Sequence, residues 1–254
     1  MLKHRVIPSL LVGHSGLVKT TRFKNPVYVG DPINAIRIFN DKEVDELILL
    51  DIVASKVNRQ PNYRIIEDVA GECFMPLAYG GGIRNLDQAS RIFALGVEKV
   101  CLQTGWLEDP SLITRIAERF GSQSVIASID VKKDWLNRPK LYSAGRSKIL
   151  QIPWLDMLQR LVDAGAGEVL LNSVDKDGTL SGPDLEIIKQ ASQALPIPLI
   201  ACGGVGSLPD IRAAVNAGAN AVAVGAFFVF YGPHRAVLIT YPNYHDLESL
   251  LETT

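Results

Sequence analysis

The sequence is poor in cysteine, which limits how the fold can be held together. Its 254 residues include three cysteines, Cys73, Cys101 and Cys202. They are odd in number, far apart and without a C-x-x-C pair, and each lies in an apolar run. This pattern excludes a disulfide framework and predicts free, buried thiols in a reducing cytosol. A chain of this length buries enough surface to fold without a disulfide or a metal.

An excess of charge of one sign is also missing. The chain has 26 basic and 27 acidic residues. This balance argues against a broad nucleic-acid surface, because such a surface needs clustered positive charge. His4, His14 and His245 are far apart in the sequence and lack ligand spacing, so we expect no metal and no cofactor.

Long hydrophobic runs are scarce as well. The N-terminal segment MLKHRVIPSLLVG has too short an apolar stretch, and no small-residue cleavage site, for a signal peptide. Residues 213–233 carry no charge and approach the length of a membrane span, but Asn216, Asn220 and several glycines interrupt them. We therefore expect a cytoplasmic protein that does not bind membranes.

Short apolar runs alternate with amphipathic stretches along the whole chain. The runs are rich in Val, Ile and Leu, which is typical of parallel strands covered on both faces. We expect strands at residues 5–11, 47–52, 76–79, 99–102, 124–130, 169–172, 198–201 and 221–224. We expect helices at residues 86–95, 112–120, 154–164, 184–194 and 208–217. This alternation predicts an α/β fold of the (β/α)₈ TIM barrel type; a doubly wound sheet fits less well, because no G-x-G-x-x-G follows the first strand.

An internal repeat supports the barrel. Residues 75–104 match residues 197–226 at an offset of 122, and ELILLD at 46–51 matches EVLLNS at 168–173 at the same offset. A constant offset over two separate blocks indicates a duplication. We expect one barrel domain over residues 1–254, built from two half-barrels at about 1–122 and 123–254.

A glycine pair follows a strand in each half, in YGGGIRN at 79–85 and in ACGGVGS at 201–207. Glycine turns between a strand and a helix expose backbone N–H groups that can hold a phosphate. Tight turns of this kind use glycine anyway, so a purely structural interpretation stays open. Two phosphate sites on opposite sides of the barrel mouth would suit an elongated ligand with two phosphates.

Asp130 ends the strand SVIASID, at the end of a barrel strand where such enzymes place their chemistry. Its carboxylate is suited to general acid or base catalysis, and a solvated carboxylate or a helix cap is the alternative. Aligning the two halves pairs VIPSLL at 6–11 with VIASID at 125–130. Leu11 therefore stands where the other half has Asp130, and leucine can neither accept nor donate a proton.

Six distinctive motifs are spread over essentially the whole chain: VIPSLLVGHSGLVK, DELILLDIVAS, PLAYGGGIR, RFGSQSVIASID, GAGEVLLNSVDKDGT and PLIACGGVG. Together they resemble the cyclase subunit family of imidazole glycerol phosphate synthase. The resemblance implies a (β/α)₈ barrel that forms a heterodimer with a separate glutaminase. It also implies that ammonia passes through the barrel to a bis-phosphorylated ribulosyl substrate, in a lyase reaction of histidine biosynthesis.

The same resemblance implies roles for particular residues. Phosphate contacts would come from two ends of the mouth, Gly82, Gln103 and Thr104 at one end and Asp177, Gly178, Gly204, Gly225 and Ala226 at the other. Lys19 matches a lysine of the mobile loop that covers the substrate. Gln103 and Ala226 replace the family's usual Asn and Ser. Leu11 replaces an essential aspartate, the partner of the one matched by Asp130, so this chain keeps one of two carboxylates and standard cyclase activity is not implied.

Four charged residues stand at the N-terminal edges of strands: Arg5, Glu46, Lys99 and Glu168. By motif they match a ring of salt-bridged residues that gates the ammonia passage in the family. Single charges at strand starts are usually solvated, but two charges of each sign could form the paired network that a constriction requires. We therefore expect the glutaminase-facing end of the barrel to be intact.

Residues 229–244, VFYGPHRAVLITYPNY, depart from the ordinary cyclase subunit. They resemble a divergent branch linked to acetamidino modification of bacterial surface sugars of the lipopolysaccharide O-antigen type. In that branch, the barrel and its glutaminase supply ammonia to a separate sugar amidotransferase. His234 and Arg235 could contact an anion or a docking partner, and a neutral loop before the strand-like run AVLITY fits as well.

Three functions remain open from the sequence. The first is a subunit of a glutamine amidotransferase complex that receives ammonia from a glutaminase and conducts it to a sugar-modifying synthase. The second is an authentic cyclase in which Asp51 or Asp177 substitutes for the missing carboxylate. The third is a non-catalytic partner that only activates the glutaminase.

Overall fold

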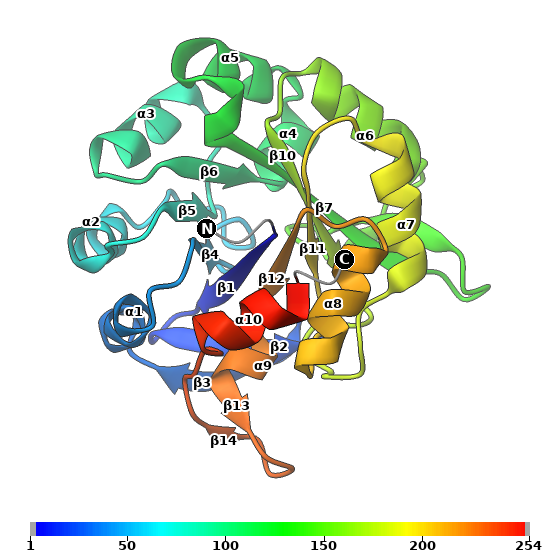
Figure 1. Cartoon of the computed structure of the whole chain (residues 1–254). Helices are drawn as coiled ribbons and strands as arrows, with labels where there is room; N and C mark the ends of the chain where they lie inside the picture. The colour runs from blue at the N-terminus through cyan, green and yellow to red at the C-terminus, as the bar shows by residue number, and fades with distance from the viewer. Residues whose placement is uncertain (1–3, 252–254) are drawn as a thin grey trace.

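Eight parallel strands close into a ring within residues 4–251, the residues described by the computed structural model (Figure 1). In chain order they are β1 (Arg5–Val12), β4 (Leu47–Asp51), β5 (Leu77–Gly80), β6 (Lys99–Leu102), β7 (Val125–Lys133), β10 (Glu168–Ser173), β11 (Leu199–Cys202) and β12 (Ala221–Val224). Each strand pairs with the next, and β12 pairs with β1 to complete the ring. The predicted TIM barrel is confirmed. The outer ends of the expected half-barrels, residues 1–3 and 252–254, lie outside the described residues.

Helices between the strands form an outer layer around the ring (Figure 1). They are α1 (Pro32–Asp41), α2 (Tyr63–Glu72), α3 (Leu86–Ala94), α4 (Thr104–Glu108), α5 (Ser111–Phe120), α6 (Trp154–Asp163), α7 (Leu185–Ala194), α8 (Leu208–Asn216), α9 (Ala226–Val229) and α10 (Tyr244–Leu251), with a 3₁₀ turn at Ser122–Ser124. In α3 the Asn85 side chain caps the N–H of Gln88 at 2.9 Å, and Ala89 and Ile92 are buried on one face. The cap and the amphipathic spacing explain why this segment is helical.

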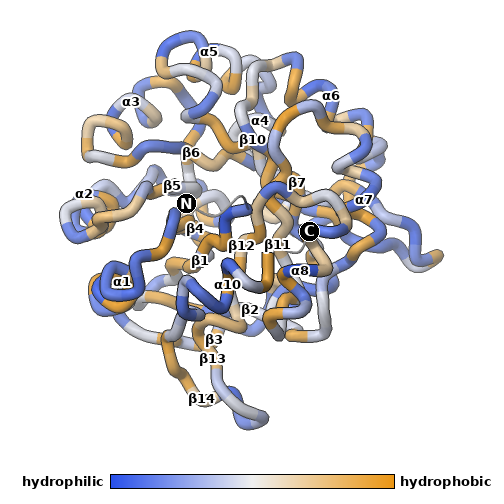
Figure 2. The backbone as a smooth tube through the Cα atoms, in the orientation of Figure 1, coloured by the Kyte–Doolittle hydropathy of each residue, from blue (hydrophilic) through white to orange (hydrophobic). Residues whose placement is uncertain are grey.

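Apolar side chains form two cores, because both faces of the ring strands are covered. Figure 2 shows hydrophobic residues along ring strands such as β1, β11 and β12. Successive residues of a strand point to opposite faces. Val6 and Leu49 therefore belong to the larger core between ring and helices, while Ile7 and Ile48 point inside the ring. The interior core consists of Ile7, Ile48, Ala78, Cys101, Ile126, Leu170, Ile200, Ala221 and Ala223. This two-sided burial accounts for the nearly continuous apolarity of the strands.

The uncharged stretch 213–233 is divided among several short elements. It holds the end of α8, then β12, α9 and β13 (Phe230–Tyr231). Within residues 4–251, no helix is both long enough and apolar enough to cross a membrane.

The three cysteines are free thiols. Cys101 is buried, as predicted, whereas the predicted burial is only partial for Cys73 and Cys202. Burial raises the pKa of Cys73 to about 11 and that of Cys202 to about 12. These thiols therefore stay protonated, and poorly nucleophilic, at neutral pH.

Antiparallel hairpins that the apolar pattern did not predict follow three segments of the barrel. β2 (Leu17–Thr21) and β3 (Lys24–Gly30) extend from β1, and β8 (Pro139–Ser143) and β9 (Lys148–Ile149) extend from β7. Near the C-terminus, β13 pairs with β14 (Ala236–Val237). Of the strand-like run AVLITY, only Ala236 and Val237 form a strand, so the prediction of a strand is wrong beyond Val237.

The two halves of the ring share one strand register. Leu11 of β1 lies opposite Leu50 of β4, and Asp130 of β7 lies opposite Asn172 of β10. Leu50 and Asn172 are themselves related by the repeat offset, since 172 minus 50 is 122. Leu11 and Asp130 therefore occupy equivalent places at the carboxyl ends of their strands.

Candidate functional site

A cavity opens at the carboxyl ends of the ring strands. It is lined by every mouth residue that the sequence singled out: Lys19, Gly82, Gln103, Thr104, Asp130, Asp177, Gly178, Gly204, Gly225 and Ala226. Leu11 and Asp51 line the same cavity. The fold thus brings residues from both halves of the chain to one site, at the end of the barrel where such folds place their chemistry.

Asp130 is a buried carboxyl group in the wall of this cavity, 5% exposed. The side-chain Nε2 of Gln103 donates a hydrogen bond to its Oδ2. Burial raises the pKa of Asp130 to about 8; the Gln103 hydrogen bond opposes that rise, and the negative charge of Asp177 adds to it. The carboxyl group is therefore mostly protonated at neutral pH. A group that titrates near the working pH is suited to general acid or base catalysis.

Leu11 gives the other half of the mouth an apolar surface. Its neighbour on β4 is Leu50, and both side chains line the cavity. Cys202 also lines it, with a thiol that stays protonated at neutral pH. The position equivalent to Asp130 therefore has no group that can exchange a proton.

Asp51 and Asp177, the two substitutes considered for the missing carboxylate, are both engaged in ion pairs. Asp51 accepts hydrogen bonds from Arg59 at 2.8 Å and from two backbone N–H groups at 2.9 and 3.0 Å. Asp177 accepts from Lys19 Nζ at 2.6 Å and from Thr20 Oγ1 at 2.8 Å. Each carboxylate thus faces a cation and further donors, unlike Asp130.

Lys19, expected in a loop after the first barrel strand, lies on strand β2 of a hairpin. β2 pairs with both β1 and β3, and the Lys19 side chain is 7% exposed. A Cβ atom at Gly225 would lie 3.1 Å from Lys19 Cε, so glycine makes room for the lysine. The hairpin of the first half therefore places an ammonium group against the second half, where it pairs with Asp177.

The glycine turns have a structural reason of their own. Gly82 and Gly204 have φ values of +74° and +98°. A Cβ atom would lie 2.7 Å from the carbonyl oxygen of Arg59 at Gly82, and 2.2 Å from that of Gly182 at Gly204. Packing and backbone conformation therefore require glycine at both turns, so the glycines by themselves do not establish a phosphate site.

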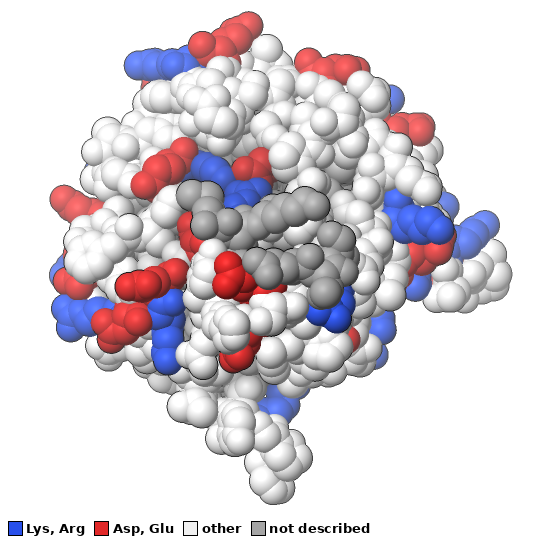
Figure 3. All heavy atoms as spheres, viewed as in Figure 1, with Lys and Arg blue, Asp and Glu red and all other residues white. Residues whose placement is uncertain are grey.

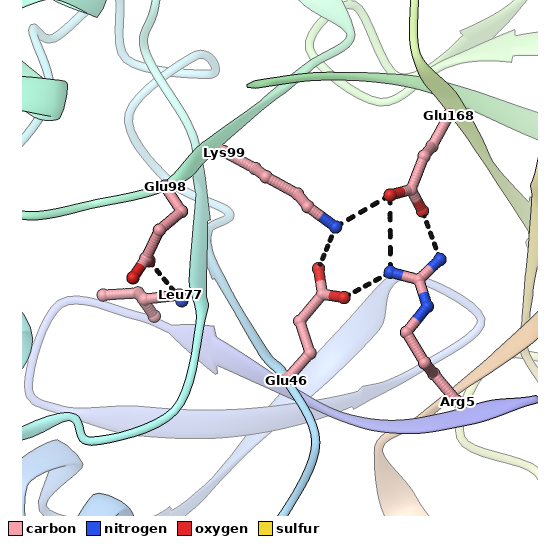
Figure 4. A network of polar contacts seen from close by, with 6 residues as sticks. All are labelled: Arg5, Glu46, Leu77, Glu98, Lys99 and Glu168. Atoms are coloured by element: carbon pink, nitrogen blue, oxygen red, sulfur yellow. Dashed lines mark hydrogen bonds and ion pairs between the residues drawn. The ribbon is translucent and has the colours of Figure 1, made fainter. Parts of the chain in front are cut away.

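Arg5, Glu46, Lys99 and Glu168 form one closed ring of ion pairs at the opposite end of the barrel (Figure 4). Arg5 contacts Glu46, and contacts Glu168 at 2.6 Å. Lys99 lies 2.9 Å from Glu46 and 2.7 Å from Glu168. Acidic and basic groups lie close together near the middle of the face shown in Figure 3. Each cation therefore bridges both anions.

The ring is partly buried, and its electrostatics reflect this. Burial alone would raise the pKa of Glu168, but hydrogen bonds from Arg5 and Lys99 outweigh burial and hold that pKa below its usual range. Glu46 is 2% exposed and Glu168 is 8% exposed. Charges this enclosed are tolerated because each one is paired.

Ser128 and Asn172 are among the polar side chains of the cavity that were not singled out from the sequence. Ser128 lies two residues before Asp130 on β7, on the same face of the strand, and this spacing was a usable signal. Asn172 lies beside Asp130 in register. Its buried Oδ1 has no hydrogen-bond partner among the described residues, so an acceptor is left unused next to the carboxyl group.

The C-terminal hairpin contacts the loop that carries Asp177. Arg235 donates a hydrogen bond from Nη2 to the carbonyl oxygen of Gly178 at 2.8 Å, and its guanidinium lies 4.7 Å from the centre of the Phe230 ring. His234, the neighbouring residue, is exposed. Arg235 thus ties the C-terminal segment to the cavity wall.

The fold and the cavity at the carboxyl ends of the strands define a (β/α)₈ barrel with its candidate site at the mouth. The chain matches the family described as "Histidine biosynthesis protein" over residues 5–234, and it belongs to that family. A Pseudomonas aeruginosa protein, provisionally named imidazole glycerol phosphate synthase subunit hisF2, is 53% identical over 98% of this chain and 99% of its own length. A provisionally named Leptospira interrogans HisF is 49% identical over the same shares of the two chains. Dictyoglomus turgidum imidazole glycerol phosphate synthase subunit HisF is 40% identical over 91% of each chain.

These similarities confirm the resemblance drawn from the six motifs. They support a cyclase-type subunit of the imidazole glycerol phosphate synthase family, in a divergent branch. The family match ends at residue 234, inside the segment 229–244 that departs from the ordinary cyclase subunit.

Proposed function

We propose that the chain is the barrel subunit of a glutamine amidotransferase complex, which receives ammonia from a separate glutaminase and conducts it to a synthase. Three features in succession along the barrel support this. The ring of ion pairs lies where the strands begin, the interior is apolar, and the cavity with Asp130 lies where the strands end. Ammonia is small and uncharged, so it can cross an apolar interior that would exclude an ammonium ion.

In this proposal Arg5, Glu46, Lys99 and Glu168 form the ammonia gate, on the face that receives the glutaminase. Passage of ammonia requires one side of the ring to open. Arg5 holds Glu168 with two nitrogen atoms, at 2.6 and 3.3 Å, and its planar guanidinium is suited to such a fork. Lys99 presents a single ammonium group on a flexible stem, so we expect Lys99 to be the residue that moves.

The observation that carries the proposal is the combination of a complete ring of ion pairs with one carboxyl group, that of Asp130, at the two equivalent strand ends, where the other half has Leu11. A general acid or base contributes about 10²–10⁴-fold to a rate, so the loss of one at Leu11 weakens the cyclase reaction far more than it weakens ammonia transfer. The ammonia acceptor in this proposal is a separate sugar amidotransferase that forms an acetamidino group on a bacterial surface sugar. The divergent segment 229–244 supports that branch.

The cavity in this proposal still takes a phosphorylated ligand. Backbone N–H groups at Gly82 and Thr104 serve one phosphate, and those at Gly178, Gly204 and Ala226 serve the other. The carboxylate of Asp177 would repel a phosphate. Its contribution is therefore indirect, through the ammonium group of Lys19 that it holds 2.6 Å away.

The second candidate is an authentic cyclase of histidine biosynthesis, favoured by the names of the relatives. It requires a replacement for the missing carboxylate. Asp51 and Asp177 line the cavity, but each would have to leave its ion pair. A purely glutaminase-activating role predicts that Asp130→Asn leaves the stimulation of the glutaminase unchanged.

The proposal is tested by expressing the chain in a cyclase-deficient histidine auxotroph, and by assaying the purified chain with a glutaminase subunit of the imidazole glycerol phosphate synthase type from the same organism. We expect no rescue of growth, together with stimulation of glutamine hydrolysis. Rescue of growth would establish the cyclase instead. Absence of both rescue and stimulation would contradict the proposal. An ordinary cyclase subunit expressed from the same plasmid is the positive control.

A further inference from the structure

The side-chain amide of Gln103, at the end of β6, faces Asp130. Its Nε2 donates to Asp130 Oδ2 and, at 3.4 Å, to the carbonyl oxygen of Tyr142 on β8. Gln103 is also the N-cap residue of α4, yet its side chain makes no capping hydrogen bond to that helix. The amide is therefore used toward the neighbouring strands β7 and β8, and not on the first turn of α4.

The repeat shows that this contact belongs to one half of the barrel. The offset of 122 relates Gln103 to Gly225, since 225 minus 103 is 122. The strand register relates Asp130 to Leu11. Gly225 has no side chain and Leu11 has no polar atom beyond its backbone, so the other half lacks both partners. The two members of the pair occur together in one half and are absent together from the other.

We propose that Gln103 is a positioning residue for Asp130, and that its amide fixes the carboxyl group by joining it to the hairpin of β7 and β8. Glutamine is one methylene longer than the asparagine usual in the family. That length lets a residue at the start of α4 reach the neighbouring strand. The phosphate contact that the resemblance implies for Gln103 would then be made by its backbone and not by its side chain. What the positioned carboxyl group does for the protein rests on the proposed function. The hydrogen bond between Gln103 and Asp130 does not depend on it.

The groups around Asp130 make the amide important. Asp177 raises the pKa of Asp130 through its negative charge, and Lys19 is engaged with Asp177. The thiols of Cys101 and Cys202 line the same cavity. Among residues 4–251, Gln103 is the one side chain that donates a hydrogen bond to the Asp130 carboxyl group. A hydrogen bond donated to a carboxylate favours its ionised form. Loss of the amide should therefore raise the pKa further.

The test is a pH titration of the purified chain by carbon-13 NMR, with label in the aspartate carboxyl groups and with Asp130→Asn used to assign the signal. Gln103→Leu keeps most of the side-chain volume and removes the amide. We expect the midpoint of Asp130 to rise by about one pH unit or more, because hydrogen bonds to charged groups are worth about that much. Gln103→Asn, which is too short to make the contact, should shift the midpoint in the same direction.

Gln159→Leu is the matched control. Gln159 donates to Asp163 at 2.8 Å on the exposed face of α6, so the same substitution there should leave the Asp130 midpoint unchanged. Circular dichroism and thermal unfolding identify the variants that are folded, and the titration is interpreted on those. A folded Gln103→Leu or Gln103→Asn protein that titrates Asp130 at the wild-type midpoint would overturn the proposal. The titration uses no ammonia, glutaminase or substrate, so its outcome is independent of the proposed function.

Discussion

The two halves of the barrel mouth share a backbone and differ in chemistry. Asp130 lies opposite Asn172 and accepts a hydrogen bond from Gln103. The equivalent Leu11 lies opposite Leu50, and Gly225 stands at the repeat position of Gln103. Strand register is set by the apolar residues that pack on both sides of the ring, and the side chain at the strand end has no part in it. The difference teaches that the two halves of a duplicated scaffold can carry different side chains at equivalent strand ends while the strand register stays the same.

The largest expected effect comes from moving the carboxyl group of Asp130 to the equivalent position in the other half, Leu11. A Leu11→Asp variant would have both carboxyl groups. The double variant Leu11→Asp with Asp130→Asn would again have one, on the other side. We expect the double variant to lose about 10²–10⁴-fold of the cyclase turnover of Leu11→Asp, measured with the bis-phosphorylated ribulosyl substrate and ammonium salt. Equal turnover would show that the two positions do not act as a pair.

The buried ion pair between the halves gives the next largest effect. Lys19→Met leaves Asp177 buried, at 4% exposure, without its cation. We expect the free energy of unfolding, measured in urea, to fall by about 3–5 kcal/mol. Arg37→Met is the control, because it breaks the exposed pair with Glu72 and should change stability little. A fall as small as the control's would mean that the Lys19 pair does not join the halves.

A smaller effect is the pH dependence that Asp130 gives to stability. Its pKa is about 8 in the folded chain and close to 4 when unfolded. Between these values the folded state binds the extra proton, so stability falls as pH rises. The fall is at most about 1.4 kcal/mol between pH 6 and pH 7. Urea unfolding at several pH values should show that Asp130→Asn removes this slope. An unchanged slope would contradict the raised pKa.

The sequence predicted the ring strands well, because each is an apolar run buried on both faces. It also predicted that Arg5, Glu46, Lys99 and Glu168 match a paired ring, although residues up to 163 positions apart had to meet. The hairpins were missed, since short strands such as β9 and β14 have two residues and no periodic pattern.

Other misses had a signal that could have been read. α1 begins after Asp31 with a proline at its first position, and the Asp31 side chain caps the N–H of Asn34 at 3.0 Å. The ion-pair partners of Asp51 and Asp177, however, could not be predicted from the sequence. Arg59 and Lys19 meet these carboxylates only through the conformation of a loop and a hairpin. Spacing in the sequence therefore predicts which residues line the mouth, but it does not predict which of their side chains are engaged in ion pairs.

The most direct test of the account compares the native chain with Leu11→Asp in one cyclase assay. Each protein is given the bis-phosphorylated ribulosyl substrate and excess ammonium salt, and substrate loss is followed by absorbance; Leu11→Asn serves as the control for polarity without acidity. The account predicts no turnover by the native chain or by Leu11→Asn, and turnover by Leu11→Asp. Turnover by the native chain would contradict it, because the cyclase reaction would then proceed with Asp130 alone or with another carboxyl group in place of the missing one.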